Sequence, residues 1–304
     1  MKRDLLTEFD LTIEEFDRIF ARSGEMKADL RQGRPHRSLA GQVLGMIFEK
    51  SSTRTRLSFE VAMIQLGGTA IFLSSRDIQI GRGETVADTA RILSRYVDGV
   101  MIRTFGQEVV EEFARYATIP VINGLTDLLH PCQILSDLFT VIEKRGGYED
   151  LKIAYVGDGN NIANSWLNTA ARLPFHLALA CPEGYEPDRG ILDRAVREAP
   201  RSAVLFRDPR DAVRDADVVY TDVWASMGQE GEKAVRAKAF QGYCIDEALL
   251  ERAKPDVVVM HCLPAHRGEE ISAAVMDGPR SIVFDQAENR LHVQKAILEM
   301  LMGR

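Results

Sequence analysis

The chain has 304 residues, more than one ordinary hydrophobic core needs, so its length favours two domains or one large α/β unit. Hydrophobic residues make up 45% and charged residues 27%, which excludes a largely disordered, collagen-like or disulfide-scaffold protein. The net charge of −7 is unfavourable for binding nucleic acid or an anionic membrane, which both require spread positive charge. Arginine nevertheless outnumbers lysine by 29 to 9, and its forked guanidinium matches phosphate geometry.

Cysteine spacing and the distribution of apolar residues predict the compartment. The four cysteines form no CxxC pair, which is typical of reduced thiols in a cytosolic protein. Charged residues interrupt the first twenty positions too early for a signal peptide, and no apolar run reaches the ~18 residues of a membrane span. We therefore expect a cytoplasmic protein. The cysteines are Cys132, Cys181, Cys244 and Cys262.

Short apolar runs alternate with helical patterns along the whole chain. A first helix begins at Thr12, whose spacing to Glu15 is that of a capping box. The first series predicts strands at 43–48, 69–73, 99–104 and 120–123, and helices at 53–66, 84–96 and 107–117. The second predicts strands at 152–157, 177–180, 203–206, 217–221, 257–261 and 281–285, and helices at 162–172, 191–198, 232–238, 246–253 and 286–302.

This alternation predicts an α/β fold of two doubly wound parallel-sheet domains linked by helices. A long helix at 132–144 joins the two series and ends at a pair of glycines. The predicted domains are residues 1–147 and 148–285, and we expect the last helix, 286–304, to pack back onto the first domain. Ligands of such sheets bind at the carboxyl ends of the strands, so we expect the active site in the cleft between the domains.

The segment Ser52-Thr53-Arg54-Thr55-Arg56 lies directly between a predicted strand and a predicted helix. A helix N-terminus presents unpaired backbone N–H groups and a partial positive charge, which suit an anion. A simple helix cap needs only one of these residues, so the run of hydroxyls and guanidiniums favours a phosphate site. It is not a P-loop, because the glycines and the GK[ST] ending are missing.

Two further strand-to-helix loops carry polar side chains. In His130-Pro131-Cys132-Gln133 the histidine could donate to a developing oxyanion, although this segment taken alone favours a partly buried structural histidine. The loop Gly157-Asp158-Gly159-Asn160-Asn161 lacks the GxGxxG pattern of a dinucleotide site. Its asparagines could be helix caps, but three within residues 160–164 exceed what capping needs and favour contacts with a polar substrate that has amino and carboxylate groups.

The last candidate segment is in two pieces, each following an apolar strand. Asp222 offers a carboxylate to a cationic group, and Ser226-Met227-Gly228 is typical of a mobile loop. Cys262 could be a nucleophile, but no histidine–acid arrangement can be demonstrated from sequence. His261 and His266 are separated by a proline and are not a helical zinc pair, so we expect no metal.

Taken together, these segments resemble the aspartate/ornithine carbamoyltransferase family over the whole chain. Ser52-Thr53-Arg54-Thr55-Arg56 and His130-Pro131-Cys132-Gln133 are similar to its carbamoyl phosphate signatures. The combination of Asp222-x-x-x-Ser226-Met227-Gly228 with His261-Cys262-Leu263-Pro264 resembles the ornithine-specific members. The resemblance implies transfer of the carbamoyl group of carbamoyl phosphate to the δ-amino group of L-ornithine, giving L-citrulline and phosphate without a cofactor or metal.

The resemblance also implies residue roles and partners. It assigns catalysis to Arg103, His130, Asp222 and Cys262. It assigns carbamoyl phosphate binding to Ser52, Thr53, Arg54, Thr55, Gln79, Arg103, His130, Gln133, Cys262, Leu263 and Arg290, with Gln79 acting from an adjacent subunit. It assigns ornithine binding to Asn161, Asp222, Ser226 and Met227. It further implies a homotrimer, possibly in higher assemblies, with no nucleic-acid or membrane partner.

Three alternatives stay open. The amine acceptor could be N-acetylornithine or putrescine instead of ornithine. The chain could be a catalytically silent relative, which the presence of Arg54, Arg103, His130 and Cys262 disfavours. It could also be a nicotinamide dehydrogenase, which the missing GxGxxG pattern disfavours.

Overall fold

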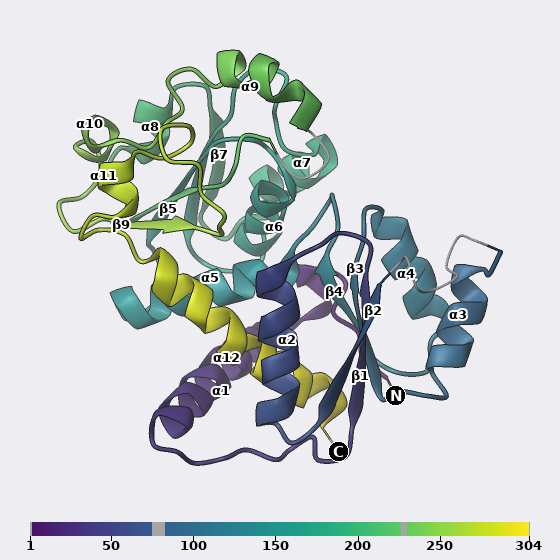
Figure 1. Cartoon of the computed structure of the whole chain (residues 1–304). Coiled ribbons are helices and arrows are strands. Elements are labelled where there is room, and N and C mark those ends of the chain that lie inside the picture. The colour runs from purple at the N-terminus through teal and green to yellow at the C-terminus, as the bar shows by residue number, and fades with distance from the viewer. Residues whose placement is uncertain (1, 75–82, 226–229, 304) are drawn as a thin grey trace. The chain divides into compact units, whose positions relative to one another are not determined.

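A computed structural model of the chain describes residues 2–74, 83–225 and 230–303 (Figure 1). The fold divides into two compact units: unit 1 comprises residues 1–139 and 288–304, and unit 2 comprises residues 140–287. Each unit contains one parallel sheet with helices, which confirms the predicted fold class. The divisions fall inside two helices, α5 (Pro131–Arg145) and α12 (Val283–Met302), whereas the predicted first boundary follows α5.

Unit 1 is built on a four-stranded sheet of order β2-β1-β3-β4, in which every pair is parallel. Its strands are β1 (Val43–Phe48), β2 (Thr69–Ser74), β3 (Gly99–Arg103) and β4 (Val121–Leu125). Its helices besides parts of α5 and α12 are η1 (Glu8–Asp10), α1 (Ile13–Arg31), α2 (Thr53–Gln65), α3 (Val86–Leu93) and α4 (Gln107–Tyr116). The predicted capping box of α1 is confirmed, because Thr12 and Glu15 each accept a hydrogen bond from the other's backbone N–H.

Helices cover both faces of this sheet. Figure 1 shows α3 and α4 on one side and α1, α2 and α12 on the other. On the α3–α4 side, Val100 and Ile102 of β3 pack with Ala90, Val110 and Phe113 in a buried cluster. The chain passes from β1 to one neighbour, β2, and later to the other, β3, so the carboxyl ends of β1 and β3 flank the position where the winding reverses.

Unit 2 contains a five-stranded parallel sheet of order β7-β6-β5-β8-β9. Its strands are β5 (Lys152–Val156), β6 (His176–Ala180), β7 (Ser202–Phe206), β8 (Val218–Thr221) and β9 (Val258–His261). Its helices are α6 (Asn161–Ala170), α7 (Arg189–Glu198), α8 (Pro209–Val213), η2 (Glu230–Glu232), α9 (Lys233–Ala239), α10 (Glu247–Leu250) and α11 (Ala273–Met276).

The two faces of the unit 2 sheet have different cores. On one face Tyr155 and Tyr220 stack at 5.9 Å between ring centroids, and Trp166 of α6 meets Tyr220 edge-on. On the other face Ala154 and Val156 pack with residues of α8, α10 and α11. Because β5 lies between β6 and β8, the winding reverses between β5 and β8, and a ligand of this unit is expected at their carboxyl ends.

The structure corrects several predicted elements. The predicted strand at 281–285 is wrong: Ser281 makes only an isolated bridge to Val259, and α12 already begins at Val283. Its short apolar run is followed by polar residues that continue a helix, and Gln286 N–H donates to the Ile282 carbonyl at 2.9 Å. The predicted helix at 246–253 shortens to α10, and the prediction missed the short helices α8 and α11. Within the described residues, no helix combines the length and apolar character that a membrane crossing needs.

Candidate active site

The first group of predicted site residues lies at the N-terminus of α2 in unit 1, directly after β1. Ser52 is the N-cap residue, and its hydroxyl accepts a 3.2 Å hydrogen bond from Thr55 N–H, so one of the hydroxyls has the ordinary capping role. Arg56 has local partners, because its Nε donates to Glu60 Oε1 at 2.9 Å and its guanidinium lies 3.9 Å from the ring centroid of Phe72. The five-residue run therefore divides into a cap at Ser52, a surface contact at Arg56, and Thr53, Arg54 and Thr55 between them in the first turn of α2.

Two arginines converge on the Thr55 hydroxyl, which is fully buried. Arg290 Nη2 donates to Thr55 Oγ1 at 2.8 Å, and Arg103 Nη1 approaches the same oxygen at 3.5 Å. Arg103 is the last residue of β3, and Arg290 lies in the third turn of α12. The two guanidiniums are only 6% and 4% exposed, so their mutual repulsion is poorly screened and an anion between them would be strongly stabilised.

Burial and the charges of the same two arginines together determine the protonation state of His130, which precedes α5. Burial lowers the pKa of its imidazole well below 6.5, and the charges of Arg290 and Arg103 lower it further. The ring is therefore neutral at physiological pH, with one nitrogen able to donate and the other able to accept. Gln133, in the first turn of α5, donates from its amide to Asp137 Oδ1 at 2.8 Å.

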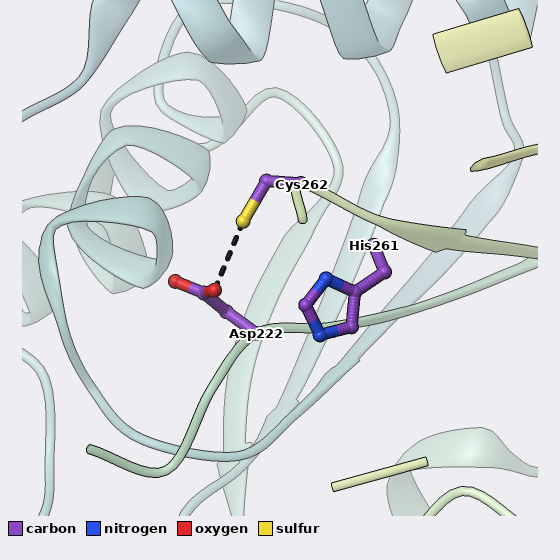
Figure 2. A group of neighbouring side chains, drawn as sticks. All are labelled: Asp222, His261 and Cys262. Atoms are coloured by element: carbon purple, nitrogen blue, oxygen red, sulfur yellow. Dashed lines mark hydrogen bonds between the residues drawn. The ribbon is translucent and has the colours of Figure 1, made fainter. Parts of the chain in front are cut away.

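The second group of predicted residues lies in unit 2 at the carboxyl ends of β5, β8 and β9. The carboxylate of Asp222 accepts three hydrogen bonds of 2.8–2.9 Å. Val223 N–H and the Cys262 thiol donate to Oδ1, and the Asn160 amide donates to Oδ2. Figure 2 shows the contact between Asp222 and Cys262 beside the imidazole of His261.

The ring of His261 is fully buried and hydrogen-bonded at both nitrogens. Nδ1 accepts a 2.8 Å bond from Leu263 N–H, which leaves Nε2 to donate to Glu270 Oε1 at 3.1 Å. Leu263 has φ of +61°, a conformation that this bond helps to hold. The ligand atoms of Asp222, His261 and Cys262 lie within 4.8 Å of one another, but a metal ion there would have to displace one bond of the imidazole.

Packing within unit 2 accounts for Gly159 in the loop between β5 and α6. A Cβ on Gly159 would lie 2.1 Å from the backbone nitrogen of Pro187, so only glycine fits for packing reasons. Asp158 pairs with Arg236 at 3.0 Å, yet burial raises the pKa of its carboxyl to about 6 against the opposing effect of that arginine. The loop is therefore shaped by contacts within unit 2 and not by the close backbone approach of a pyrophosphate.

The described part of the chain accounts for most of the predicted site. Unit 1 holds Ser52, Thr53, Arg54, Thr55, Arg103, His130, Gln133 and Arg290. Unit 2 holds Asn161, Asp222, Cys262 and Leu263. Gln79, Ser226 and Met227 lie outside the described residues. Asn160 and Glu270 are not among the predicted site residues, although Asn160 lies in the predicted loop and Glu270 lies nine residues after His261.

Comparison with known proteins gives a consistent result over the whole chain. Residues 3–143 match the family model "Aspartate/ornithine carbamoyltransferase, carbamoyl-P binding domain", and residues 149–301 match the corresponding "Asp/Orn binding domain". Ornithine carbamoyltransferase of Syntrophus aciditrophicus is 70% identical over 99% of this chain and 100% of its own length, and that of Geobacter metallireducens is 62% identical over the same shares. The structure of the Pyrococcus furiosus ornithine carbamoyltransferase superposes with a TM-score of 0.96 at 52% identity, covering 99% of this chain and 97% of the other.

Proposed function

This chain belongs to the aspartate/ornithine carbamoyltransferase family, and we propose that it transfers the carbamoyl group of carbamoyl phosphate to the δ-amino group of L-ornithine. The products would be L-citrulline and phosphate. The three relatives named above are all ornithine carbamoyltransferases, which supports ornithine as the acceptor.

The convergence of Arg103 and Arg290 on Thr55 is the observation that carries the proposal. Two buried guanidiniums beside the N-terminus of α2 form a site for a small, doubly charged anion, as carbamoyl phosphate is. We assign phosphate binding in unit 1 to these residues together with Ser52, Thr53 and Arg54, and carbamoyl contacts to His130 and Gln133.

The reaction needs charge stabilisation at the carbamoyl oxygen. The neutral amine attacks the carbonyl carbon, the bond from that carbon to the bridging phosphate oxygen breaks, and the amine proton passes to the departing phosphate. In the tetrahedral state the carbonyl oxygen becomes negative, and a preorganised donor to it is worth a few kcal/mol. Thr55, Arg103 and the neutral ring of His130 are the donors we assign to this oxygen.

The carboxylate of Asp222 supports ornithine binding in unit 2. The amino acid carries two ammonium groups near neutral pH, and the δ-ammonium must lose a proton before it reacts. We propose that Asp222, Asn161, Ser226 and Met227 bind ornithine, and that Cys262 and Leu263 line the reacting centre. Residues 1–147 with 286–304 would then form the carbamoyl phosphate domain, and residues 148–285 the ornithine domain.

We also propose a cytoplasmic homotrimer in which Gln79 reaches the phosphate of an adjacent subunit. An apolar surface on unit 1 supports a contact with a second copy: Leu57 and Ile64 lie on one face of α2 and are 53% and 68% exposed. Ile71, on the edge strand β2, is 45% exposed. Light scattering coupled to size-exclusion chromatography would test the trimer.

A steady-state assay for the carbamoylated product tests the activity. Both substrates are varied, and L-ornithine, N-acetylornithine and putrescine are compared as acceptors. We expect the highest kcat/KM for L-ornithine. A higher value for either other amine would replace the proposed acceptor, and no turnover with any amine would indicate a catalytically silent relative.

A further inference from the structure

Asn160 connects the start of α6 to the carboxylate of Asp222 by a single side chain. It is the N-cap residue of α6, and its Oδ1 accepts hydrogen bonds from Ile162 N–H at 2.9 Å and Ala163 N–H at 3.4 Å. Its Nδ2 donates to Asp222 Oδ2 at 2.8 Å. Because backbone N–H groups can only donate, the amide oxygen must face the helix, and the NH₂ group is therefore directed at Asp222.

The position of Asn160 follows from the topology of unit 2. Asn160 follows β5, and Asp222 follows β8; these strands are neighbours in the sheet and flank the reversal of winding. The Tyr155 hydroxyl, on β5, reaches Asn160 Oδ1 at 3.3 Å and donates to the Asp158 carbonyl at 2.7 Å. The amide is thus held from the strand and from the helix before it meets the carboxylate.

The three donors to Asp222 fix how the carboxylate is oriented. Oδ1 receives Val223 N–H and the Cys262 thiol, and among residues 2–74, 83–225 and 230–303 the donor to Oδ2 is Asn160. A carboxylate offers about four lone-pair sites, so three protein donors leave roughly one for a ligand cation. Without the Asn160 donor, no other side chain or backbone group of the described segments would hold Oδ2, and the carboxylate could turn about Oδ1.

We propose that Asn160 is a positioning residue, which sets the orientation of the Asp222 carboxylate for the ammonium group of the amine substrate. This inference rests on the proposed function, because it concerns binding of the same substrate. Asn160 acts through Asp222 and has no assigned contact with the reacting atoms.

Two conservative substitutions separate this role from helix capping. Serine and aspartate are both good N-cap residues, so Asn160→Ser and Asn160→Asp retain the cap of α6. The first removes the donor to Asp222, and the second also places a negative charge against it. Asp188→Ala is the matched control: Asp188 caps α7 in the same unit through a 3.0 Å bond from Ile191 N–H.

We expect a roughly ten- to hundred-fold rise in the KM for L-ornithine in both variants, since the lost bond involves a charged group. The KM should rise most in Asn160→Asp at pH 8, and the excess over Asn160→Ser should shrink as the pH falls, because a proton shared by the two carboxyls restores a donor. The Kd for carbamoyl phosphate, measured by calorimetry, should stay at the wild-type value. Asp188→Ala should lower the Tm without changing the KM for L-ornithine or the Kd for carbamoyl phosphate.

Other results would overturn the assignment. An unchanged ornithine KM in both variants would remove the role of Asn160, as would equal losses for both substrates. Unfolding of Asn160→Ser, seen by circular dichroism, would show that the amide is structural. Absence of citrulline formation by the wild-type protein would instead overturn the proposed function, so the two failures are distinguishable.

Discussion

Arg290 Nη2 donates a 2.8 Å hydrogen bond to Thr55 Oγ1, although the two residues are 235 positions apart in the chain. The hydroxyl that receives this bond also receives Arg103. A neutral oxygen between two guanidiniums orients both without neutralising either. An anion bound beside Thr55 would therefore meet two positively charged donors.

Replacing Arg290 by lysine should weaken carbamoyl phosphate binding by roughly ten- to hundred-fold. Lysine keeps the charge but lacks the planar fork, so it cannot hold Thr55 and a phosphate oxygen at once. Calorimetric titration with carbamoyl phosphate measures the effect. Arg56→Lys is the control, because Arg56 contacts Glu60 and Phe72 and should retain wild-type affinity. Wild-type affinity in Arg290→Lys would refute the assigned role.

His130 should stay neutral through the range in which an ordinary histidine titrates. Its depressed pKa means that the unfolded chain binds a proton below about pH 6.5 while the folded chain does not. The stability that depends on the neutral ring is therefore present above about pH 6.5 and is lost as the pH falls. The ¹⁵N shifts of the imidazole, assigned with a His130→Asn variant, should show no titration between pH 8 and 6. A midpoint near 6.5 would contradict the prediction.

Carbamoyl phosphate should raise the pKa of His130. A bound dianion offsets the charges of Arg103 and Arg290, which are the two groups that lower this pKa beyond the effect of burial. The same NMR titration in the presence of saturating inorganic phosphate tests the change. A further decrease of the pKa would place the anion elsewhere.

Asp222→Asn should weaken the binding of ornithine and leave the binding of carbamoyl phosphate unchanged. The substitution keeps the shape of the side chain but removes the negative charge that attracts an ammonium group. We expect the ornithine KM to rise by roughly ten- to hundred-fold, with the Kd for carbamoyl phosphate unchanged. Asp188→Asn, at the cap of α7, is the matched control. Equal losses for both substrates would argue for a structural role of Asp222.

Asp217 should contribute to stability and not to catalysis. Its carboxylate is almost fully buried and accepts bonds from Lys152 N–H at 2.9 Å, Arg145 Nη2 at 3.2 Å and Lys254 Nζ at 2.7 Å. Asp217→Ala should lower the free energy of unfolding by about 3 kcal/mol and the Tm by roughly 5–10 °C, with kcat and KM unchanged. Asp256→Ala is the control, because Asp256 also pairs with Arg145 but is exposed. The Tm of this variant should differ little from that of the wild-type protein. Equal Tm changes would contradict the importance of burial.

Most elements could be predicted because strand and helix periods differ strongly in this chain. The apolar runs of β1, β5 and β9 are bounded by polar loops, which left little ambiguity about their type. The run at 281–285 was wrongly predicted as a strand because five residues are too few to show a period, and helical residues follow at once. The short helices α8 and α11 were missed for the same reason.

The sequence predicted the site residues that belong to a recognisable motif. It could not decide which of two adjacent asparagines has which role. The sequence predicted Asn160 and Asn161 in one loop, but only the folded structure shows that Asn160 caps α6 and donates to Asp222. The buried bond from His261 to Glu270 likewise joins two residues on opposite sides of a loop, a pairing that no local period reveals.

The split composition of unit 1 has a consequence for synthesis on the ribosome. Residues 140–287 are continuous, so every residue of unit 2 has been translated before Arg290 is added to the chain. Unit 1 also needs residues 288–304, so its anion site lacks the guanidinium of Arg290 until that late segment has been translated. Amino-terminal domains usually fold first during synthesis, but here unit 2 is fully translated before unit 1 is. A nascent chain stalled before residue 288 would therefore bind carbamoyl phosphate poorly, whatever the folding state of its amino-terminal half.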